Sequence, residues 1–289
     1  MAKDFKAAIR ERAKELGIDL IGFAGPERFH DACGVAILPP GRDPFKIFPE
    51  AKTVILVGRL IPRGALRGAE EGTTFASYGN FGCRMLDDQF NAATTYDLVR
   101  FIEDAGYEAC PIFPNPDAIN NMGVPVEPGR PAPNVAPDFD YAAVACGLGE
   151  IGLSGQFLSP EFGHRQRFQM IITDAELGSD PLYSGEKLCN QCGACISGCP
   201  LGALSVENTK IRVICGKTFP VAELDKKLCE SCLNGGTANR LHPKGDPDRM
   251  AAACNRACVR ALSERGIGRM KNEFKAEKSW AKDRQGRLV

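Results

Sequence analysis

The sequence predicts an α+β protein in two parts, a helix-and-strand domain followed by a smaller cysteine-rich domain. Apolar residues recur at helical and then at strand spacing over the first part of the chain, which indicates alternating helices and strands. Nine of the 13 cysteines follow residue 188 of the 289, so cysteine usage itself divides the chain. A chain of this length can hold one large domain and one small domain. We place the large domain at 1–180, the cysteine-rich domain at 181–262 and a basic tail at 263–289.

The charge of the chain is balanced, with 36 Lys and Arg against 36 Asp and Glu. Because such a chain has no excess of positive charge to attract polyanions, we expect neither a general nucleic-acid binder nor a membrane-surface binder. No apolar run approaches the length of a membrane-spanning helix. The odd number of cysteines, and a charged start without an apolar signal segment, argue against a secreted disulfide scaffold and predict a cytoplasmic protein.

The first element is expected to be an amphipathic helix over 5–16, because its apolar residues recur at helical spacing. Gly17 follows as a C-cap, and the apolar residues 18–23 predict a strand directly after it. Five prolines in 25–50 prevent regular structure over most of that stretch, which we expect to be a surface loop. The apolar residues of 52–58 predict a buried strand.

A second helix is predicted over 85–105, ending at Gly106, and a strand is predicted over 107–112. The segment 111–137 holds eight prolines, and long irregular segments of this kind are either binding loops or linkers. Apolar residues interspersed among the prolines favour an ordered loop over a linker. Residues 167–173 alternate between apolar and polar side chains and predict another strand.

A glycine-rich stretch, Cys146-Gly-Leu-Gly-Glu-Ile-Gly152, contains a literal G-x-G-x-x-G. Such a motif can be a dinucleotide-binding turn, with Asp174 at about the right distance to bind a ribose. That interpretation needs an uninterrupted helix through the third glycine, and Pro160 and Gly163 break any such helix early. Two alternatives stay open, a glycine turn without a ligand and a loop whose backbone approaches a large flat cofactor.

The strongest motif is C-x2-C-x2-C-x3-C-P, formed by Cys189, Cys192, Cys195, Cys199 and Pro200. In this spacing three thiolates reach three irons of one [4Fe–4S] cluster, while the fourth cysteine binds a second cluster. A structural zinc site would more naturally show two separated C-x2-C pairs. The motif therefore predicts a domain like the bacterial ferredoxins that hold two [4Fe–4S] clusters.

Two clusters need four thiolates beyond the motif, and the chain supplies five: Cys215, Cys229, Cys232, Cys254 and Cys258. In the simplest assignment the first cluster takes either Cys258 or Cys254 besides the first three cysteines of the motif. The second cluster takes the fourth cysteine of the motif together with Cys215, Cys229 and Cys232. One cysteine is then surplus. The four cysteines that stand singly earlier in the chain are expected to be small buried hydrophobic residues: Cys33, Cys83, Cys110 and Cys146.

Two further runs lie between the glycine-rich stretch and the cysteine motif, Phe157-Leu-Ser-Pro-Glu-Phe-Gly-His-Arg-Gln-Arg-Phe168 and Thr173-Asp174. In this order the three features resemble the cobalamin-binding core and ferredoxin module of reductive dehalogenases, and the related core of epoxyqueuosine reductase. The opening run 16–29 is also similar to the start of epoxyqueuosine-reductase-like proteins. The resemblance is close over 141–204 and patchy over 1–140.

This resemblance implies a nitroreductase-like α/β core that holds a base-off cobalamin, and a ferredoxin domain whose two clusters feed it single electrons. The chemistry would then belong to the cobalt, which the protein orients and shields. It further implies backbone contacts to the corrin edge from Gly147, Leu148, Gly149, Glu150 and Gly152. The chain shows no twin-arginine signal and no helical-repeat region after its last cysteine, so we expect neither a respiratory role at the membrane nor a tRNA substrate.

Reductive cleavage needs a proton donor near the cofactor, and our candidate is Tyr78, in a glycine-flanked segment before the second helix. The alternative is a packed tyrosine whose hydroxyl binds backbone. Asp138 and Asp140, ahead of the glycine-rich stretch, are weaker candidates. The stretch 260–289 holds nine cations against four acids, which favours a solvated helix or a docking site for an acidic electron donor.

These observations together predict a cytoplasmic, anaerobic iron–sulfur reductase with two [4Fe–4S] clusters and a cobalamin. Its expected partners are a low-potential electron donor such as ferredoxin or flavodoxin, and a small organic substrate or a corrinoid protein. No membrane and no nucleic acid are expected as partners. Two alternatives stay open, an electron-transfer or reductive-activation protein without its own corrinoid, and an enzyme that uses a flavin or nicotinamide.

Overall fold

The computed structural model describes residues 2–114, 124–130, 135–240, 246–268 and 280–289, which divide into two compact units. The first unit comprises Met1–Arg59, Asp87–Leu148 and Arg167–Tyr183, and the second comprises Leu60–Leu86, Gly149–Gln166 and Ser184–Val289. The last stretch of the second unit begins close to the domain boundary expected near residue 180. The second unit also takes 60–86 and 149–166, which the sequence had placed in the first domain.

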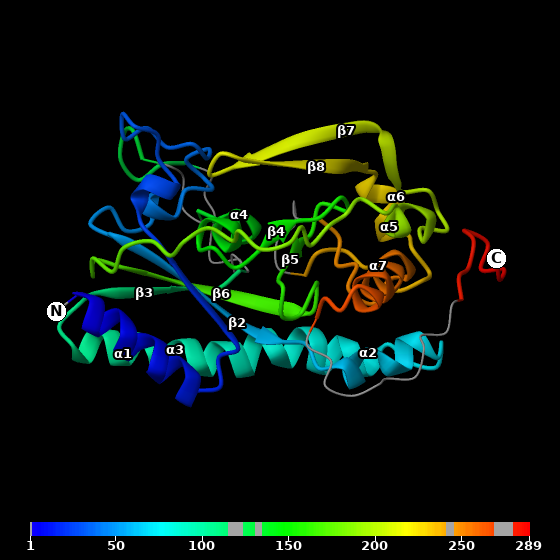
Figure 1. The fold of residues 1–289 in the computed structure, drawn as a ribbon, viewed down its shortest axis with the longest axis horizontal. Helices are drawn as coiled ribbons and strands as arrows, with labels where there is room; N and C mark the ends of the chain where they lie inside the picture. The colour runs from blue at the N-terminus through cyan, green and yellow to red at the C-terminus, as the bar shows by residue number, and fades with distance from the viewer. Residues whose placement is uncertain (1, 115–123, 131–134, 241–245, 269–279) are drawn as a thin grey trace. The chain divides into compact units, whose positions relative to one another are not determined.

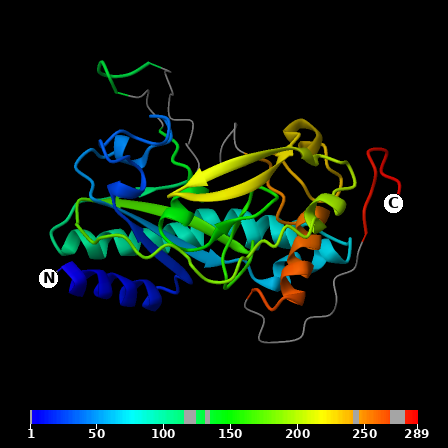
Figure 2. The ribbon, with the colours of Figure 1, turned by 45° about the horizontal axis from the view of Figure 1, so that its top comes forward.

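The first unit is built on a four-stranded sheet with the strand order β1-β2-β6-β3. Its strands are β1 (Leu20–Ala24), β2 (Thr53–Leu60), β3 (Ala109–Ile112) and β6 (Gln166–Thr173). β1 pairs with β2, and β3 with β6, in the antiparallel sense. Helices α1 (Ala2–Glu15) and α3 (Ala92–Asp104) cover one face of the sheet, and α4 (Phe139–Ala145) lies over the other (Figure 1 and Figure 2).

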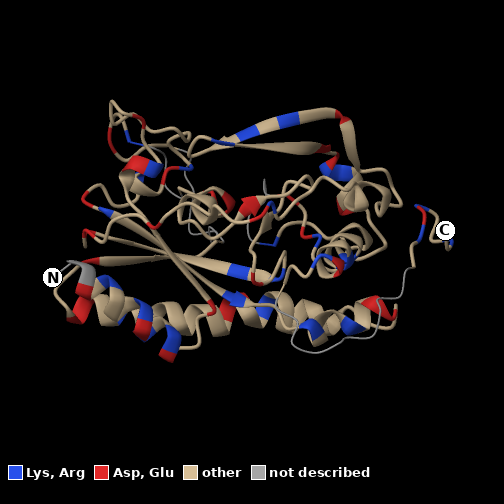
Figure 3. Cartoon of the chain, viewed as in Figure 1, with Lys and Arg blue, Asp and Glu red and all other residues tan. Residues whose placement is uncertain are grey.

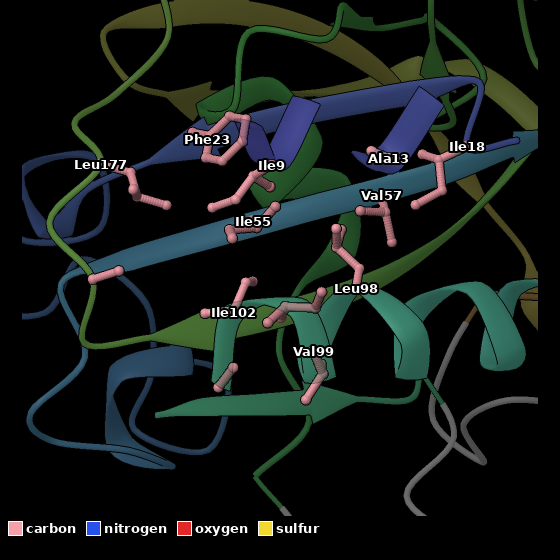
Figure 4. Close-up of a cluster of buried hydrophobic side chains, with 13 residues drawn as sticks. Ile9, Ala13, Ile18, Phe23, Ile55, Val57, Leu98, Val99, Ile102 and Leu177 are labelled. Carbon is pink, nitrogen blue, oxygen red and sulfur yellow. The ribbon is translucent and has the colours of Figure 1, made fainter. Parts of the chain in front are cut away.

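The hydrophobic core of this unit lies between the sheet and the helices α1 and α3 (Figure 4). Ile9 and Ala13, one helical turn apart on α1, are fully buried against this core. Ile55 of β2 and Ile102 of α3 complete its centre and are also fully buried. Each side chain of this kind stabilises the fold by about 1.5–3 kcal/mol relative to exposure. The polar face of α1 carries both signs of charge in turn (Figure 3).

Most of the predicted elements of the first unit are confirmed. The first helix ends before Gly17, whose positive φ of 75° only glycine adopts easily, and β1 and β2 follow where apolar runs predict them. Between them the structure has only two short 3-10 turns, η1 (Pro26–Arg28) and η2 (Pro44–Lys46). This loop does pack part of itself inward, since Phe45 is buried.

One prediction for this part of the chain needs correction, and another falls partly on residues that the structure does not describe. The helix expected over 85–105 begins as an α-helix only at Ala92, and two π-helical segments precede it, η3 (Tyr78–Arg84) and η4 (Leu86–Asn91). Such wide turns are rare, and sequence periodicity at 3.6 residues does not detect them. Of the proline-rich segment 111–137, residues 115–123 and 131–134 lie outside the described residues.

The second unit combines short helices with a long β-hairpin. Its strands are β4 (Glu150–Ile151), β5 (Phe157–Leu158), β7 (Leu204–Ile214) and β8 (Lys217–Leu224). Its helices are α2 (Arg63–Glu70), which the sequence analysis missed, α5 (Ala194–Ser197), α6 (Lys226–Glu230) and α7 (Ala253–Glu264). β4 pairs with β5 and β7 with β8, both antiparallel. The mixture of helices and strands confirms the α+β class.

Two small cores hold the second unit together. One packs α2 against the residues of η3 and against Met250. The other gathers Leu153, Leu204, Ala222 and Ala252 around several cysteines. Within the part of the chain that the structure describes, no helix is both long and apolar enough to cross a membrane.

Candidate functional site

The cysteines of the second unit are carried by two helices that pack against each other. α5 is a single turn inside the cysteine motif, entered through Gly193 with a positive φ of 75°. α7 carries Cys254 and Cys258 one helical turn apart, so both side chains lie on one side of the helix. A Cβ on Gly198, at the end of α5, would lie 2.7 Å from the Cβ of Ala257, so glycine permits this close approach. Figure 1 shows α5, α6 and α7 gathered in one region of this unit.

One group of four cysteines lines a single hollow. Its members are Cys189, Cys192, Cys195 and Cys258. Burial raises the pKa of the Cys258 thiol, and the charges of the three motif cysteines raise it further. Burial likewise raises the pKa of Cys195 to about 11. These thiols are therefore close enough to act on one another, and the structure places Cys258 rather than Cys254 beside the first three motif cysteines.

A second group of four is formed by Cys199, Cys229, Cys232 and Cys254. Burial raises the pKa of Cys254 to about 12, and the neighbouring charges of the other three cysteines add to this effect. Burial also raises the pKa of Cys229 to about 11, again with contributions from Cys232 and Cys199. Together the two groups account for eight of the nine cysteines that follow residue 188.

The ninth cysteine, Cys215, lies at the turn between β7 and β8 and adopts a positive φ of 49°. The base of this hairpin, at Leu204, packs beside Cys199 and Cys254. The strand that runs back to this base, β8, has eight residues, a length of about 23 Å at 3.3 Å per residue. The structure thus groups Cys254, and not Cys215 as expected, with Cys199, Cys229 and Cys232.

The four single cysteines divide between buried and accessible positions. Cys83 and Cys146 are buried, as expected for small hydrophobic residues. Cys110 is half-buried on β3, and Cys33 is exposed, so the expectation of burial was wrong for Cys33.

Neither group has the geometry of a single-ion site. Within the described ranges, no three side chains of His, Cys, Asp or Glu converge closely enough to hold one metal ion. A [4Fe–4S] cube binds each thiolate through a different iron, and so spaces its ligands more widely than one ion does. All-thiol donor sets that do not converge on one ion fit such cubes.

Hydrogen-bond donors point at the sulfurs of both groups. The backbone N–H of Leu153 donates to Cys189 Sγ over 3.3 Å, and Nε2 of His164 lies 3.2 Å from Cys258 Sγ. In the second group, the N–H of Asn234 donates to Cys232 Sγ over 3.4 Å. Donors of this kind favour thiolates over thiols, because they compensate the negative charge.

Arg249 provides the sharpest test of whether an anionic cofactor fits here. Its side chain is 1% exposed, and its Nη2 donates to the carbonyl of Ser154 over 2.8 Å. Its Nε and Nη1 atoms have no hydrogen-bond acceptor among the described residues. The charge of Arg249 opposes the burial effect on the pKa of Cys229 and of Cys254. A buried cation is costly unless an anion compensates it, and a cluster held by four thiolates carries net negative charge.

His164 is also buried beside these groups, with 2% of its surface exposed. Burial, reinforced by the charge of Arg249, lowers the pKa of His164 to about 4. A hydrogen bond with the backbone of Phe157 acts in the opposite direction on this pKa. Arg249 stands in no motif recognised in the sequence. His164 lies in the run 157–168 that carries the family resemblance, but that run assigned it no role.

The glycine-rich stretch does not have the context of a dinucleotide site. Helix α4 precedes it and the two-residue strand β4 follows it, the reverse of the strand-then-helix order that such a site requires. Asp174, the expected ribose ligand, accepts a hydrogen bond from the backbone N–H of Glu108 over 2.9 Å. The structure therefore gives no support to a nicotinamide at this loop.

The glycines of the stretch are required by the chain's own backbone. A Cβ on Gly147 would lie 2.1 Å from the carbonyl oxygen of Pro181, and one on Gly149 would lie 1.9 Å from that of Leu158. The carboxylate of Glu150 accepts a hydrogen bond from the N–H of Leu188 over 3.0 Å. Internal packing is thus sufficient to explain these residues, and corrin contacts by Gly147, Leu148, Gly149, Glu150 and Gly152 stay a prediction.

Tyr78, the candidate proton donor, is 7% exposed and lies in a hydrophobic cluster. Its hydroxyl donates to both carboxylate oxygens of Asp248, over 2.7 and 2.8 Å. The same carboxylate accepts from the N–H of Met250 over 3.0 Å. This geometry matches a packed tyrosine with a satisfied hydroxyl, although its partner is a side chain and not backbone. Asp138, a weaker candidate, caps α4 by accepting from Tyr141 N–H over 2.9 Å.

The basic tail is described only in part, because residues 269–279 lie outside the described residues. Residues 280–289 contain turns and a bridge, with no helix. The indole of Trp280 donates to the carbonyls of Ala69 and Glu70, over 3.0 and 3.1 Å. Arg256 of α7 stacks on the Trp280 ring, with 4.5 Å between guanidinium carbon and ring centre. Residues 280–289 are therefore anchored to the second unit, whereas most of the stretch expected as a solvated helix lies outside the described residues.

Comparison with known proteins identifies relatives among reductases, although no family model matches the chain. A tetrachloroethene reductive dehalogenase of Desulfitobacterium hafniense is 30% identical over 118 residues, which make up 40% of this chain and 18% of that protein. A similar protein of Dehalobacter restrictus matches to the same extent. The matched region thus spans less than a fifth of these relatives.

Solved structures extend the resemblance to the fold. A reductive dehalogenase with B12-dependent activity has a TM-score of 0.53 and 17% identity, over 90% of this chain and 34% of that one. An epoxyqueuosine reductase bound to a tRNA stem loop has a TM-score of 0.48 and 16% identity, over 87% and 71% of the two chains. The chain has the fold of reductive dehalogenases and is homologous to reductases. The resemblance expected from the sequence is confirmed.

Proposed function

We propose that the chain is an iron–sulfur oxidoreductase that carries electrons one at a time through two [4Fe–4S] clusters. Cys189, Cys192, Cys195 and Cys258 would hold the first cluster, and Cys199, Cys229, Cys232 and Cys254 the second. The observation that carries the proposal is this division of eight cysteines into two groups of four, each with at least one buried thiol and each completed by one cysteine of α7. The crossed use of the motif, with Cys199 in the second group, is that of two-cluster ferredoxins.

The clusters, when bound, supply single-electron transfer at low potential. The protein's contribution is to hold eight thiolates, to exclude water around them and to compensate their charge. Leu153 and His164 direct donors at the first group, and Arg249 places a cation beside the second. Burial among apolar side chains keeps each interaction unscreened by solvent.

The electrons would pass to a corrinoid and from it to a small organic substrate, and a low-potential donor such as ferredoxin or flavodoxin would supply them. This part of the proposal is supported by the fold shared with a B12-dependent dehalogenase and by the sequence match to tetrachloroethene reductive dehalogenases. Gly147, Leu148, Gly149, Glu150 and Gly152 would face the corrin, with Tyr78 as candidate proton donor. We propose a cytoplasmic protein, without nucleic acid as a partner.

A second candidate function is favoured by the packing of the glycine-rich stretch. Since its glycines are crowded by Pro181 and Leu158, the loop needs no corrin to explain its composition. An electron-transfer or reductive-activation protein without its own corrinoid would keep both clusters and the same fold. The two functions differ in their metal content.

Anaerobic reconstitution of the full chain with iron, sulfide and cobalamin separates them. We expect about eight irons per chain from two four-iron clusters, together with one cobalt that survives gel filtration. Eight irons without retained cobalt would favour the electron carrier. Four irons would contradict the two-cluster proposal, and no iron would contradict both functions.

A further inference from the structure

We propose that His164 is a positioning residue of the first cluster, whose Nε2–H donates a hydrogen bond to the sulfur of Cys258 and raises the reduction potential of that cluster. The inference rests on the proposed function, because it presumes a cluster on the first group of cysteines. It assigns a task to a residue that belongs to no ligand motif.

The contact itself is direct and enclosed. Nε2 lies 3.2 Å from Cys258 Sγ, the imidazole is 2% exposed, and both residues line the hollow formed by the first group. A thiolate bound to iron has no proton and can only accept. Nε2 must therefore carry the hydrogen of this contact, whichever charge the ring has.

The backbone around His164 is fixed on both sides of the ring. Ser159 and Gly163 close a tight turn through two hydrogen bonds of 2.9 Å, one in each direction. Gly163 adopts a positive φ of 60°, and a Cβ there would lie 3.0 Å from Cδ1 of Leu262 on α7. On the other side, the carbonyl of Arg165 accepts from the N–H of Ile61 over 2.9 Å. The ring is thus presented to α7 by a rigid turn, and not by a mobile side chain.

The direction of the effect follows from charge. Reduction adds one electron to a cluster that is already anionic, so a hydrogen bond to a ligand sulfur stabilises the reduced form more than the oxidised form. In a buried site this difference is not screened by water. Loss of the donor should therefore lower the potential of the first cluster and leave that of the second largely unchanged.

The same segment also contributes the backbone N–H of Leu153 to Cys189, over 3.3 Å. Residues 149–166 therefore supply donors to two of the four ligands of the first group. The segment that follows the glycine-rich stretch therefore helps to shape the cluster site, whether or not a corrin binds.

The test is a redox titration of the anaerobically reconstituted full chain, monitored by electron paramagnetic resonance. In His164→Met, which keeps bulk and removes the donor, we expect one midpoint potential to fall while the other stays. A tenfold loss in the reduction equilibrium corresponds to about 59 mV for one electron. His164→Gln, whose amide can donate, should restore part of the shift, and His30→Phe, which removes a histidine of the first unit, should cause none.

A second measurement does not depend on variants. In the native chain labelled with ¹⁵N-histidine, the reduced first cluster should show magnetic coupling to a histidine nitrogen. With two clusters present, three outcomes would each overturn the inference. They are unshifted potentials in His164→Met, a shift in His164→Gln as large as in His164→Met, and absence of ¹⁵N coupling. Failure of the native chain to bind about eight irons would instead contradict the proposed function.

Discussion

The interiors of the two units are built from different chemistry. In the first unit the core is apolar, and the fully buried Thr53 beside it is satisfied, since its hydroxyl donates to Ala175 over 2.7 Å and accepts from Leu177 over 3.1 Å. In the second unit, Arg249 and Asn255 are at most 1% exposed, and both keep polar atoms without partners among the described residues. Buried polar groups in folded proteins are normally paired. Thr95 Oγ1 of the first unit also lacks a partner among the described residues, so the difference between the interiors lies in charge. The second interior encloses an arginine whose Nε and Nη1 have no acceptor in the described chain, and the clusters proposed above would compensate this cation.

The largest effect is expected from the two cysteines of α7. Cys258→Ser should remove the first cluster and Cys254→Ser the second, so each variant should retain about four of the eight irons. The two variants should lose different paramagnetic signals. Cys254→Ser should lose the signal that Cys199→Ser or Cys232→Ser also removes, and Cys258→Ser should lose the other. Iron analysis and electron paramagnetic resonance of the reduced proteins measure both. Cys83→Ser is the control, since Cys83 is a buried cysteine of the cluster around α2 and belongs to neither group.

The identical loss of one signal in Cys254→Ser and Cys258→Ser would contradict the two groups described here. Retention of all iron in either variant would do the same, because it would mean that the mutated cysteine is not a ligand.

Arg249→Met tests whether the Arg249 cation compensates the charge of the clusters. The variant should stabilise the cluster-free protein and destabilise the protein with clusters bound. Without clusters the guanidinium is a buried cation with no anion, so its removal should raise the free energy of unfolding by about 1–4 kcal/mol. With clusters bound, loss of the cation should lower the thermal midpoint and the potential of the second cluster. Denaturant unfolding of cluster-free and loaded protein provides the comparison.

Arg63→Met is the matched control for this experiment. Arg63 is also buried in the second unit, where it pairs with Glu70. Its removal leaves a buried carboxylate alone, and should cost about 3–5 kcal/mol whether or not clusters are present. If Arg249→Met and Arg63→Met behaved alike in both states, the cation would have no special relation to the clusters.

The contrast between the units also explains what the sequence could predict. Local signals were sufficient for the first unit, because periodicity and a helix-ending glycine such as Gly17 depend on neighbours in the chain. The cysteine motif was equally local. Local signals could not show which cysteine of α7 joins Cys195 in the first group, because Cys258 reaches it only through the packing of α7 on α5. Sequence spacing also does not show that a hairpin turn carries Cys215, so it could not separate Cys215 from Cys254 as a member of the second group. Arg249 has no motif and is revealed by its burial, and the run that contains His164 gives no sign of its contact with Cys258.

Gly149→Ala tests whether the glycine-rich stretch is shaped by the chain or by a ligand. A Cβ at this position would lie 1.9 Å from the carbonyl oxygen of Leu158, a backbone atom that cannot move aside alone. We expect a loss of about 3 kcal/mol in protein prepared without cobalamin. Gly64→Ala, in helix α2 with no atom within 4 Å of its Cβ, should instead be stabilising by about 0.5–1 kcal/mol. If the stability of Gly149→Ala were unchanged, internal packing would not require glycine at this position, and contact with a ligand would be the better explanation.

Tyr78→Phe should have a smaller effect and separates packing from catalysis. The variant loses one hydrogen bond to the carboxylate of Asp248, which keeps the N–H of Met250 as a donor. The free energy of unfolding should fall by about 1.5 kcal/mol, with iron content unchanged. If Tyr78 is the proton donor, turnover should fall far more than stability. Equal turnover with reduced stability would leave Tyr78 as a packing residue alone.

The smallest effect is expected for Cys215→Ser, although this cysteine belongs to the same sequence region as the eight proposed ligands. Because Cys215 lies at the hairpin turn, about 23 Å of strand from the base that packs beside Cys199, serine should leave about eight irons and both paramagnetic signals unchanged. Cys254→Ser, measured in parallel, should lose about half of the iron. A loss of iron in Cys215→Ser with retention in Cys254→Ser would restore the grouping expected from spacing. The two variants together therefore decide whether Cys215, as sequence spacing suggests, or Cys254, as packing suggests, is the fourth ligand of the second cluster.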